Sequence, residues 1–310
     1  MIMTATTPAR PERSSAISRR RFLTAAEPWA YLAPGVALVM LVMLVPLAVG
    51  ISFSFQNYVI FRPHARGWSG LENYLELWAD RTFWLSLSNT ARWTLWSVGL
   101  QLLLGLGLAL ILNQRFPGRA VYQSLVFLPW AVPTFLSGLN WQWLFNPVVS
   151  PLPAVLATIG ALDEPRNILS DPDLALYGPI TAMVWWGVPF FGITLLAALR
   201  SIPGELYEAA AIDGATGWQA FRHITMPYLM PMITITILLR TVWVANSPDL
   251  IFVMTGGGPA NASQTLPNYV FTSAYKSMNF GYASALATVL MVMLIAYSVV
   301  LLMVRGRLKQ

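Results

Sequence analysis

The pattern of apolar and polar positions divides the chain into six long apolar stretches separated by polar segments. The stretches cover about Trp29–Phe53, Thr90–Asn113, Val121–Phe145, Tyr177–Leu199, Tyr228–Thr255 and Tyr282–Val304. Each can supply the roughly 20 residues that a helix needs to cross the hydrocarbon core of a bilayer. Lipid-facing backbone must hydrogen-bond within its own segment, and the short alternating stretches of a β-barrel are missing. The pattern predicts an all-α, polytopic bundle of six transmembrane helices.

Composition agrees with a membrane protein. Only 10% of the residues are charged, 56% are hydrophobic, and the mean hydropathy is +0.58, whereas about a quarter of the residues of a soluble domain are charged. The 13 Trp and 11 Tyr residues suit the headgroup region. Because the chain contains no Cys, disulfides and thiolate metal sites are excluded.

Basic residues predict the orientation. The formal charge is +6, which in a soluble protein would suggest nucleic acid, but here the Lys and Arg residues cluster beside apolar spans. Most lie in the two terminal segments and in the loops near Arg115, Arg200 and Arg222, so these segments are expected in the cytoplasm. We therefore expect no nucleic-acid partner, a flexible basic cytoplasmic tail over 1–27, a transmembrane domain over 28–305, and a cytoplasmic tail over 306–310.

A polar segment, 201–227, separates the fourth and fifth spans. Its first part, "ELYEAAAID", is rich in helix formers. Gly214 suits the left-handed position that ends a helix, and Thr216 can cap a second short helix. Pro227 is expected to close that second helix and to open the fifth span. The segment therefore predicts a helix, a tight turn and a helix.

Two roles are open for this segment on spacing alone. Charges at Glu208 and Asp213 beside Trp218 and Phe221 would suit docking into a groove of a partner. A helix resting on lipid headgroups is the alternative, although such helices usually carry several Lys or Arg.

The same segment resembles the "EAA" loop of bacterial ABC importer permeases. The matching positions are Glu208, Ala209, Ala210, Gly214, Ile224 and Pro227, with Met226 where Leu is usual. Other stretches, among them "TGGGP" at Thr255–Pro259 and "SLVFLPWAVP" at Ser124–Pro133, are similar to the carbohydrate branch of this family. The likeness extends over roughly residues 28–305.

This resemblance implies a transport subunit of the bacterial inner membrane rather than an enzyme. It implies that the segment 201–227 is the coupling loop that docks in a cleft of an ATPase, through Glu208, Ala209, Ala210, Asp213, Gly214, Ile224 and Pro227. It also implies a second homologous permease, two ATP-binding subunits, an extracytoplasmic solute-binding protein and surrounding lipid. ATP and Mg would bind to the partner subunits, and this chain would hold no cofactor or metal. The imported solute would be a sugar or sugar-like compound of unspecified identity.

Polar residues in the fifth span are candidates for a substrate pathway. At 1.5 Å per residue, Arg240 lies about 18 Å into a helix that starts at Tyr228, near the middle of the bilayer, where an Arg faces a cavity or a partner. Arg240, Trp243, Asn246 and Ser247 together offer hydrogen-bonding groups and an aromatic surface, as sugars require. Helix packing is the competing role for these four residues.

Two other classes of protein compete with an importer subunit. A membrane-embedded glycosyl or lipid transferase would need paired acids or a metal cluster, and Asp171 with Asp173 is the nearest such pair. An ion-coupled secondary transporter often needs acids inside the membrane, for which Asp249 is the candidate.

Overall fold

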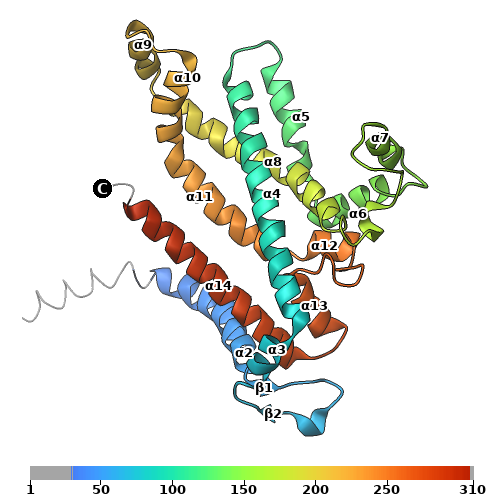
Figure 1. Ribbon diagram of the computed structural model, residues 1–310. Coiled ribbons are helices and arrows are strands. Elements are labelled where there is room, and N and C mark those ends of the chain that lie inside the picture. Colours follow the sequence, from blue (N-terminus) through green and yellow to red (C-terminus); the bar gives the residue numbers. More distant parts are fainter. Residues whose placement is uncertain (1–28, 30, 308–310) are drawn as a thin grey trace, which may run out of the picture. The chain divides into compact units, whose positions relative to one another are not determined.

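The computed structural model describes residue 29 and residues 31–307, which are mostly helical (Figure 1). The expected tail over 1–27 lies outside the described residues. The described residues form two compact units, with the boundary between Ser52 and Phe53. In the first unit a helix runs from Tyr31 and includes a π-helical turn, Met40–Leu44. Its side chains are exposed from Tyr31 to Val49, and a helix that is apolar on all sides is typical of a membrane span.

The second unit contains a short β-hairpin and a series of helices. The hairpin pairs β1 (Gln56–Asn57) with β2 (Gly67–Trp68) in antiparallel register. The helix of the first unit ends with α2 (Val45–Phe53). The helices of the second unit are α3 (Glu72–Ala79), α4 (Arg81–Asn113), α5 (Arg119–Ala131), α6 (Thr134–Leu144), α7 (Leu152–Thr158), α8 (Tyr177–Arg200), α9 (Gly204–Ile212), α10 (Gly217–Ala220), α11 (Met226–Ala245), α12 (Asp249–Met254), α13 (Leu266–Tyr275) and α14 (Phe280–Arg307). Short 3-10 turns cover Pro63–Ala65 and Ile168–Ser170, and a π-helical turn, η4, covers Phe221–Thr225.

The described residues contain five helices long and apolar enough to cross a membrane, or six if α5 and α6 form one broken span. These two helices bend by 94° at their junction, so the span expected over about Val121–Phe145 consists of two helices with a sharp bend between them. Pro133 explains the break, because proline lacks an N–H and pushes the preceding residue out of helical conformation. The indole Nε1 of Trp186 donates to the carbonyl oxygen of Val132 at 2.7 Å and stabilises the break.

The fifth expected span is also interrupted. Helix α11 ends at Ala245, and α12 begins again at Asp249 after Pro248. The turn at Asn246 and Ser247 directly precedes Pro248, which disfavours helical conformation in the residue before it. The stretch Gly217–Met254 is nevertheless one candidate span, which agrees with the span expected over about Tyr228–Thr255. Helix α14 extends to Arg307, so the expected cytoplasmic tail 306–310 starts inside a helix.

The core of the second unit forms where α4 packs against α8. An added Cβ on Gly105 would lie 2.4 Å from Cβ of Phe191, and one on Gly192 would lie 2.8 Å from Cδ2 of Leu108. Small residues thus let the two backbones approach closely, as is common for helices packed in lipid. Asp80 caps the first turn of α4 by accepting from the backbone N–H of Thr82 at 2.7 Å. This long helix positions the polar groups described next.

Candidate functional site

Helices α9 and α10 form a helical hairpin between α8 and α11, and lie together at one end of those two helices (Figure 1). Gly214 has a φ of +75° in the turn between them, a conformation that glycine adopts without steric cost. Thr216 and Gln219 form a capping box, in which the Gln219 side chain accepts from Thr216 N–H at 2.7 Å and Gln219 N–H donates to the Thr216 hydroxyl at 3.3 Å. The helix, turn and helix expected from the sequence are therefore present.

The expected helix end at Pro227 is wrong. From Gly217 the chain stays helical through η4 and into α11, and Pro227 is the second residue of α11. In η4 the N–H of Met226 bonds to the carbonyl oxygen of Phe221, five residues back. This wider π-helical turn changes the hydrogen-bond register just before Pro227, which has no N–H to donate, so the helix can continue past Pro227.

The coupling residues expected from the sequence lie on or beside this hairpin. Glu208, Ala209, Asp213 and Gly214 are exposed, Ala210 and Ile224 are half-buried, and Pro227 is exposed in the first turn of α11. A cavity of about 370 Å³ separates the turn from the next helix, and Ala210, Asp213, Gly214 and Ile224 contribute to its lining.

Large apolar side chains are exposed at the same hairpin. Ile212 is 87% exposed and Trp218 is 68% exposed, and the indole of Trp218 stacks on Phe221 with ring centroids 5.5 Å apart. Exposed apolar groups beside acidic ones on a rigid hairpin are typical of a surface that binds a protein partner.

Arg240 lies in the interior of the second unit and is 1% exposed. Its Nε donates to Oε1 of Gln101 on α4 at 2.7 Å, and its Nη2 lies 3.6 Å from the sulfur of Met183 on α8. Its guanidinium carbon is 4.8 Å from the centre of the Trp186 ring and 5.7 Å from that of Phe190. None of these partners is a carboxylate, so neutral and aromatic groups of α4 and α8 stabilise this cation.

Gly187 creates the space in which Arg240 meets Gln101. A Cβ added to Gly187 would lie 2.3 Å from Cδ and Oε1 of Gln101 and 2.4 Å from Nη2 of Arg240. The Gln101 amide is held in turn, because its Nε2 donates to the backbone carbonyl of Met183 at 2.9 Å. The three helices α4, α8 and α11 therefore meet at one buried polar cluster, which we call the Arg240 cluster: Arg240, Gln101, Met183, Trp186 and Gly187.

Of the other three pathway candidates, Trp243 lies next to this cluster, and Asn246 and Ser247 do not. Trp243 is 50% exposed and packs on Phe190 with ring centroids 5.5 Å apart, so Phe190 lies beside both Trp243 and Arg240. Asn246 is exposed, and Ser247 is half-buried in the turn after α11.

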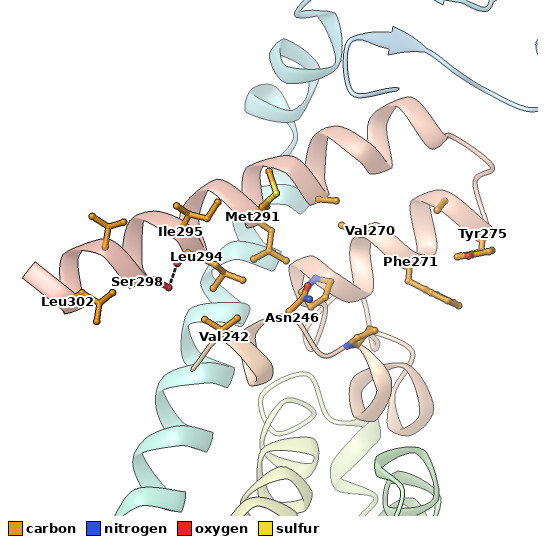
Figure 2. A pocket seen from close by; sticks show the side chains of 16 residues that line it. Val242, Asn246, Val270, Phe271, Tyr275, Met291, Leu294, Ile295, Ser298 and Leu302 are labelled. Atoms are coloured by element: carbon orange, nitrogen blue, oxygen red, sulfur yellow. Dashed lines mark hydrogen bonds between the residues drawn. The ribbon is translucent and has the colours of Figure 1, made fainter. Parts of the chain in front are cut away.

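Asn246 instead contributes to the lining of a different cavity, of about 610 Å³, between the end of α11, α13 and α14 (Figure 2). The rest of that lining is mostly aliphatic and aromatic, with Met291 and Leu294 from α14 and Phe271 from α13 among the labelled residues. The structure thus brings Arg240 and Trp243 together around Phe190 and leaves Asn246 apart from them.

A second polar cluster, outside the candidate residues, joins the start of α4 to α13 and α14. The Asp80 carboxylate accepts from the hydroxyls of Tyr269 and Tyr282, each at 2.7 Å. Burial acts to raise the pKa of Asp80, but these hydrogen bonds and that of Thr82 N–H outweigh it and lower the pKa below its usual value. Burial and the bond to Asp80 raise the pKa of Tyr269 to about 12.

Analysis of the sequence missed the partners of Arg240. Gln101 could have been found, because an amide within an apolar stretch needs a polar neighbour. The role of Gly187 in making space could not, because it depends on where α4 and α11 approach α8.

The geometry defines a multi-pass membrane protein whose long apolar helices enclose a buried polar cluster and which exposes a capped helical hairpin. Residues 101–308 match the family described as "binding-protein-dependent transport system inner membrane component", and the chain belongs to this family. It is thus a permease subunit of an ABC importer of the inner membrane, and ATP hydrolysis in such systems belongs to a separate subunit. This membership sets aside the transferase and the ion-coupled transporter as classes.

Relatives align with most of the chain. The chain is 35% identical over 277 residues to the trehalose/maltose transport system permease protein MalF of Thermococcus litoralis, covering 89% of this chain and 92% of that protein. It is 33% identical over 259 residues to the sulfoquinovosyl glycerol transport system permease protein SmoG of Agrobacterium fabrum, covering 84% and 83% respectively. A bacterial ABC transporter that imports the acidic polysaccharide alginate has a similar fold, with a TM-score of 0.79, 21% identity and coverage of 96% of this chain and 100% of that chain.

Proposed function

We propose that this permease subunit moves a sugar or sugar-like solute across the bacterial inner membrane by alternating access. The observation that carries this proposal is the alignment, over more than four fifths of the chain, with relatives named for trehalose or maltose and for sulfoquinovosyl glycerol. Those names include a neutral disaccharide and a sulfonated glycoside, so the proposed class is a glycoside and does not depend on the charge of the solute.

We further propose that the chain works with a second, homologous permease subunit, two ATP-binding subunits and an extracytoplasmic solute-binding protein. In this arrangement both termini face the cytoplasm, and the α9–α10 hairpin docks on an ATP-binding subunit through Glu208, Ala209, Ala210, Asp213, Gly214, Ile224 and Pro227. The exposed Ile212 and Trp218 support a protein partner, because such side chains are stabilised when a partner covers them. ATP and Mg bind to the partner subunits.

The solute pathway is proposed to follow the half of α11 that carries Arg240, Trp243, Asn246 and Ser247. The half-exposed indole of Trp243 can stack on the C–H face of a sugar ring, and Asn246 and Ser247 can bond to its hydroxyls. Arg240 can reach a solute only after leaving Gln101, so in this scheme its contact belongs to a second conformation of the bundle. A switch of this kind requires different contacts in its two states.

Transport by the reconstituted complex tests the proposal. The chain, its permease and ATPase partners and the cognate binding protein are placed in proteoliposomes, and uptake of labelled trehalose, maltose and sulfoquinovosyl glycerol is measured. We expect uptake of a glycoside that needs both ATP and the binding protein, and that continues when a protonophore removes the proton gradient. Uptake that stops with the protonophore and continues without ATP would refute an ABC mechanism, and ATP-dependent uptake of a solute that is not a glycoside would refute the substrate class.

Docking of the hairpin has a separate test. The chain has no native Cys, so single cysteines at Ala209 or Gly214 can be crosslinked without background from this subunit. We expect crosslinks to the ATP-binding subunit, whereas a cysteine at the exposed Val148, in the connection between α6 and α7, should not react with it. Crosslinks from neither hairpin position would contradict this mode of coupling.

A further inference from the structure

Helix α9 is attached to the rest of the protein by few side chains. It has no buried residue, and its apolar contacts with the core come from the half-buried Leu206 and Tyr207. Among the described residues, α9 makes one side-chain hydrogen bond, between the hydroxyl of Tyr207 and Oγ1 of Thr225 at 2.9 Å. The position of α9 therefore depends strongly on this pair.

Thr225 lies directly before the first residue of α11. It is the last residue of η4 and is 5% exposed, so its hydroxyl is fixed in place by the surrounding core. The chain is helical without interruption from η4 into α11, and α11 carries Arg240 into its cluster with α4 and α8. A displacement of Thr225 along α11 is therefore transmitted to the Arg240 cluster.

The connection from α9 back to α8 is of a different kind. The two helices are separated by Ser201, Ile202 and Pro203, which lie outside both. Proline at this point removes a backbone donor and keeps α8 and α9 from forming one continuous helix. The covalent link from α9 to α8 is thus a break, whereas the Tyr207–Thr225 bond ties α9 to a continuous helix.

We propose that Tyr207 and Thr225 are positioning residues that direct the movement of the hairpin into α11 rather than into α8. This inference rests on the proposed function of the hairpin as the contact for an ATP-binding subunit. Without the bond, α9 can turn about the Ser201–Pro203 break and the Gly214 turn, so movement that the ATPase imposes on α9 is taken up there, and only movement imposed on α10 reaches α11 through the continuous helix. ATP hydrolysis then proceeds with less solute transported.

The test removes one hydroxyl at a time in the complete reconstituted transporter. Tyr207→Phe and Thr225→Val each delete one partner of the bond and retain the shape of the side chain. We expect the solute transported per ATP hydrolysed to fall about fivefold, the size expected for one neutral hydrogen bond, while the ATPase remains bound. Because both changes delete the same interaction, the double variant Y207F/T225V should be no worse than either single variant.

Matched variants separate this role from general effects on folding. Thr236 on α11 is 2% exposed, and within the described part of the chain its hydroxyl bonds to the carbonyls of its own helix, Met232 and Ile233. Thr236→Val therefore removes a buried hydroxyl without affecting the hairpin. Thr225→Ser keeps the hydroxyl and should transport as the parent protein does, as should Thr236→Val.

Three outcomes overturn the proposal. An unchanged ratio of transport to hydrolysis in both Y207F and T225V shows that the bond carries no coupling, and loss of the bound ATPase in these variants shows that it acts only in assembly. Equal losses in T236V show a general effect of deleting a hydroxyl from α11. The crosslink from a cysteine at Ala209, measured in a variant that keeps Tyr207 and Thr225, decides separately whether the hairpin contacts the ATPase at all, so failure of the bond and failure of the proposed docking can be told apart.

Discussion

Replacement of Gln101 by Leu should expose the energetic cost of burying Arg240. The change removes Oε1 of Gln101, which accepts from Arg240 Nε at 2.7 Å. Because Leu has nearly the volume of Gln, the change creates little empty space. Hydrogen bonds to charged groups contribute about 1.5–3 kcal/mol, and at 1% exposure no bulk water can replace the lost acceptor. We therefore expect Q101L to lower the free energy of unfolding by about 2–3 kcal/mol, which is a factor of roughly 30 to 150 in the folded population.

Thermal unfolding of the purified transporter, followed by tryptophan fluorescence, measures this effect. A loss of this size corresponds to a melting temperature lower by roughly 5 °C. Gln123→Leu is the control, because Nε2 of Gln123 is buried without a hydrogen-bond partner among the described residues, and its loss should leave the melting temperature near that of the parent protein.

The double variant R240M/Q101L completes the test. Replacing both partners by apolar side chains leaves no unpaired buried charge, and such replacements are often neutral or stabilising. The double variant should therefore recover most of the stability lost in Q101L. A Q101L protein that melts with the parent, or a double variant that is less stable than Q101L, would refute the assignment of Gln101 as the partner that stabilises the cation.

Three further predictions follow from positions elsewhere in the structure. Gly187→Ala places a methyl group 2.3 Å from Gln101 and should destabilise the protein by about 1–3 kcal/mol in the same fluorescence assay, whereas Gly107→Ala, where an added Cβ meets no atom within 4 Å, should not. Gly214→Val puts a β-branched residue at a φ of +75° and should cost about 1–2 kcal/mol of local stability, read as faster hydrogen exchange confined to the hairpin; unchanged exchange would contradict it. The pKa of Asp80 is lowered in the folded protein, so its contribution to stability is present above the ordinary pKa of 3.8 and is lost as the pH falls through the lower folded value. Tyr269→Phe removes one of the hydrogen bonds that lower this pKa, so its melting temperature should decline less steeply than that of the parent protein from about pH 6 to about pH 3. An identical decline in both proteins would contradict this account.

The apolar pattern predicted where helices form, because stretches of 20 or more apolar residues leave few alternatives to a helix in lipid. It could not predict where they break. Pro133 and Pro248 both interrupt expected spans, and yet Pro189, Pro129 and Pro231 lie inside helices that continue. Whether a proline ends a helix depends on contacts from elsewhere in the fold. At the break before Pro133, the indole of Trp186 on α8 donates to the Val132 carbonyl. The β-hairpin was missed for a simpler reason, since strands of two residues are too short to show a periodicity.

The turn and the helix cap between α9 and α10 were predictable because their signals are local, whereas the expected helix end at Pro227 was wrong. Gly214 and Thr216 act on neighbouring backbone groups, so the turn and the cap follow from adjacent letters of the sequence. The surroundings of Arg240 depend instead on residues more than 50 positions away, Gln101 and Met183. Depth in the bilayer could be estimated from residue spacing, but the choice between solvent, solute and protein partners could not.

The length of α4 has a consequence for how the two ends of the protein are related. Its 33 residues span about 50 Å, well beyond the roughly 30 Å of a hydrocarbon core. Near its start, the Asn89 amide donates to the backbone carbonyls of Asn261, Ala262 and Gln264 in the connection between α12 and α13, and about 18 Å further along Gln101 bonds to Arg240. A tilt of α4 should therefore move the connection between α12 and α13 together with Arg240. A spectroscopic label on that connection would then report on a rearrangement around the buried Arg240.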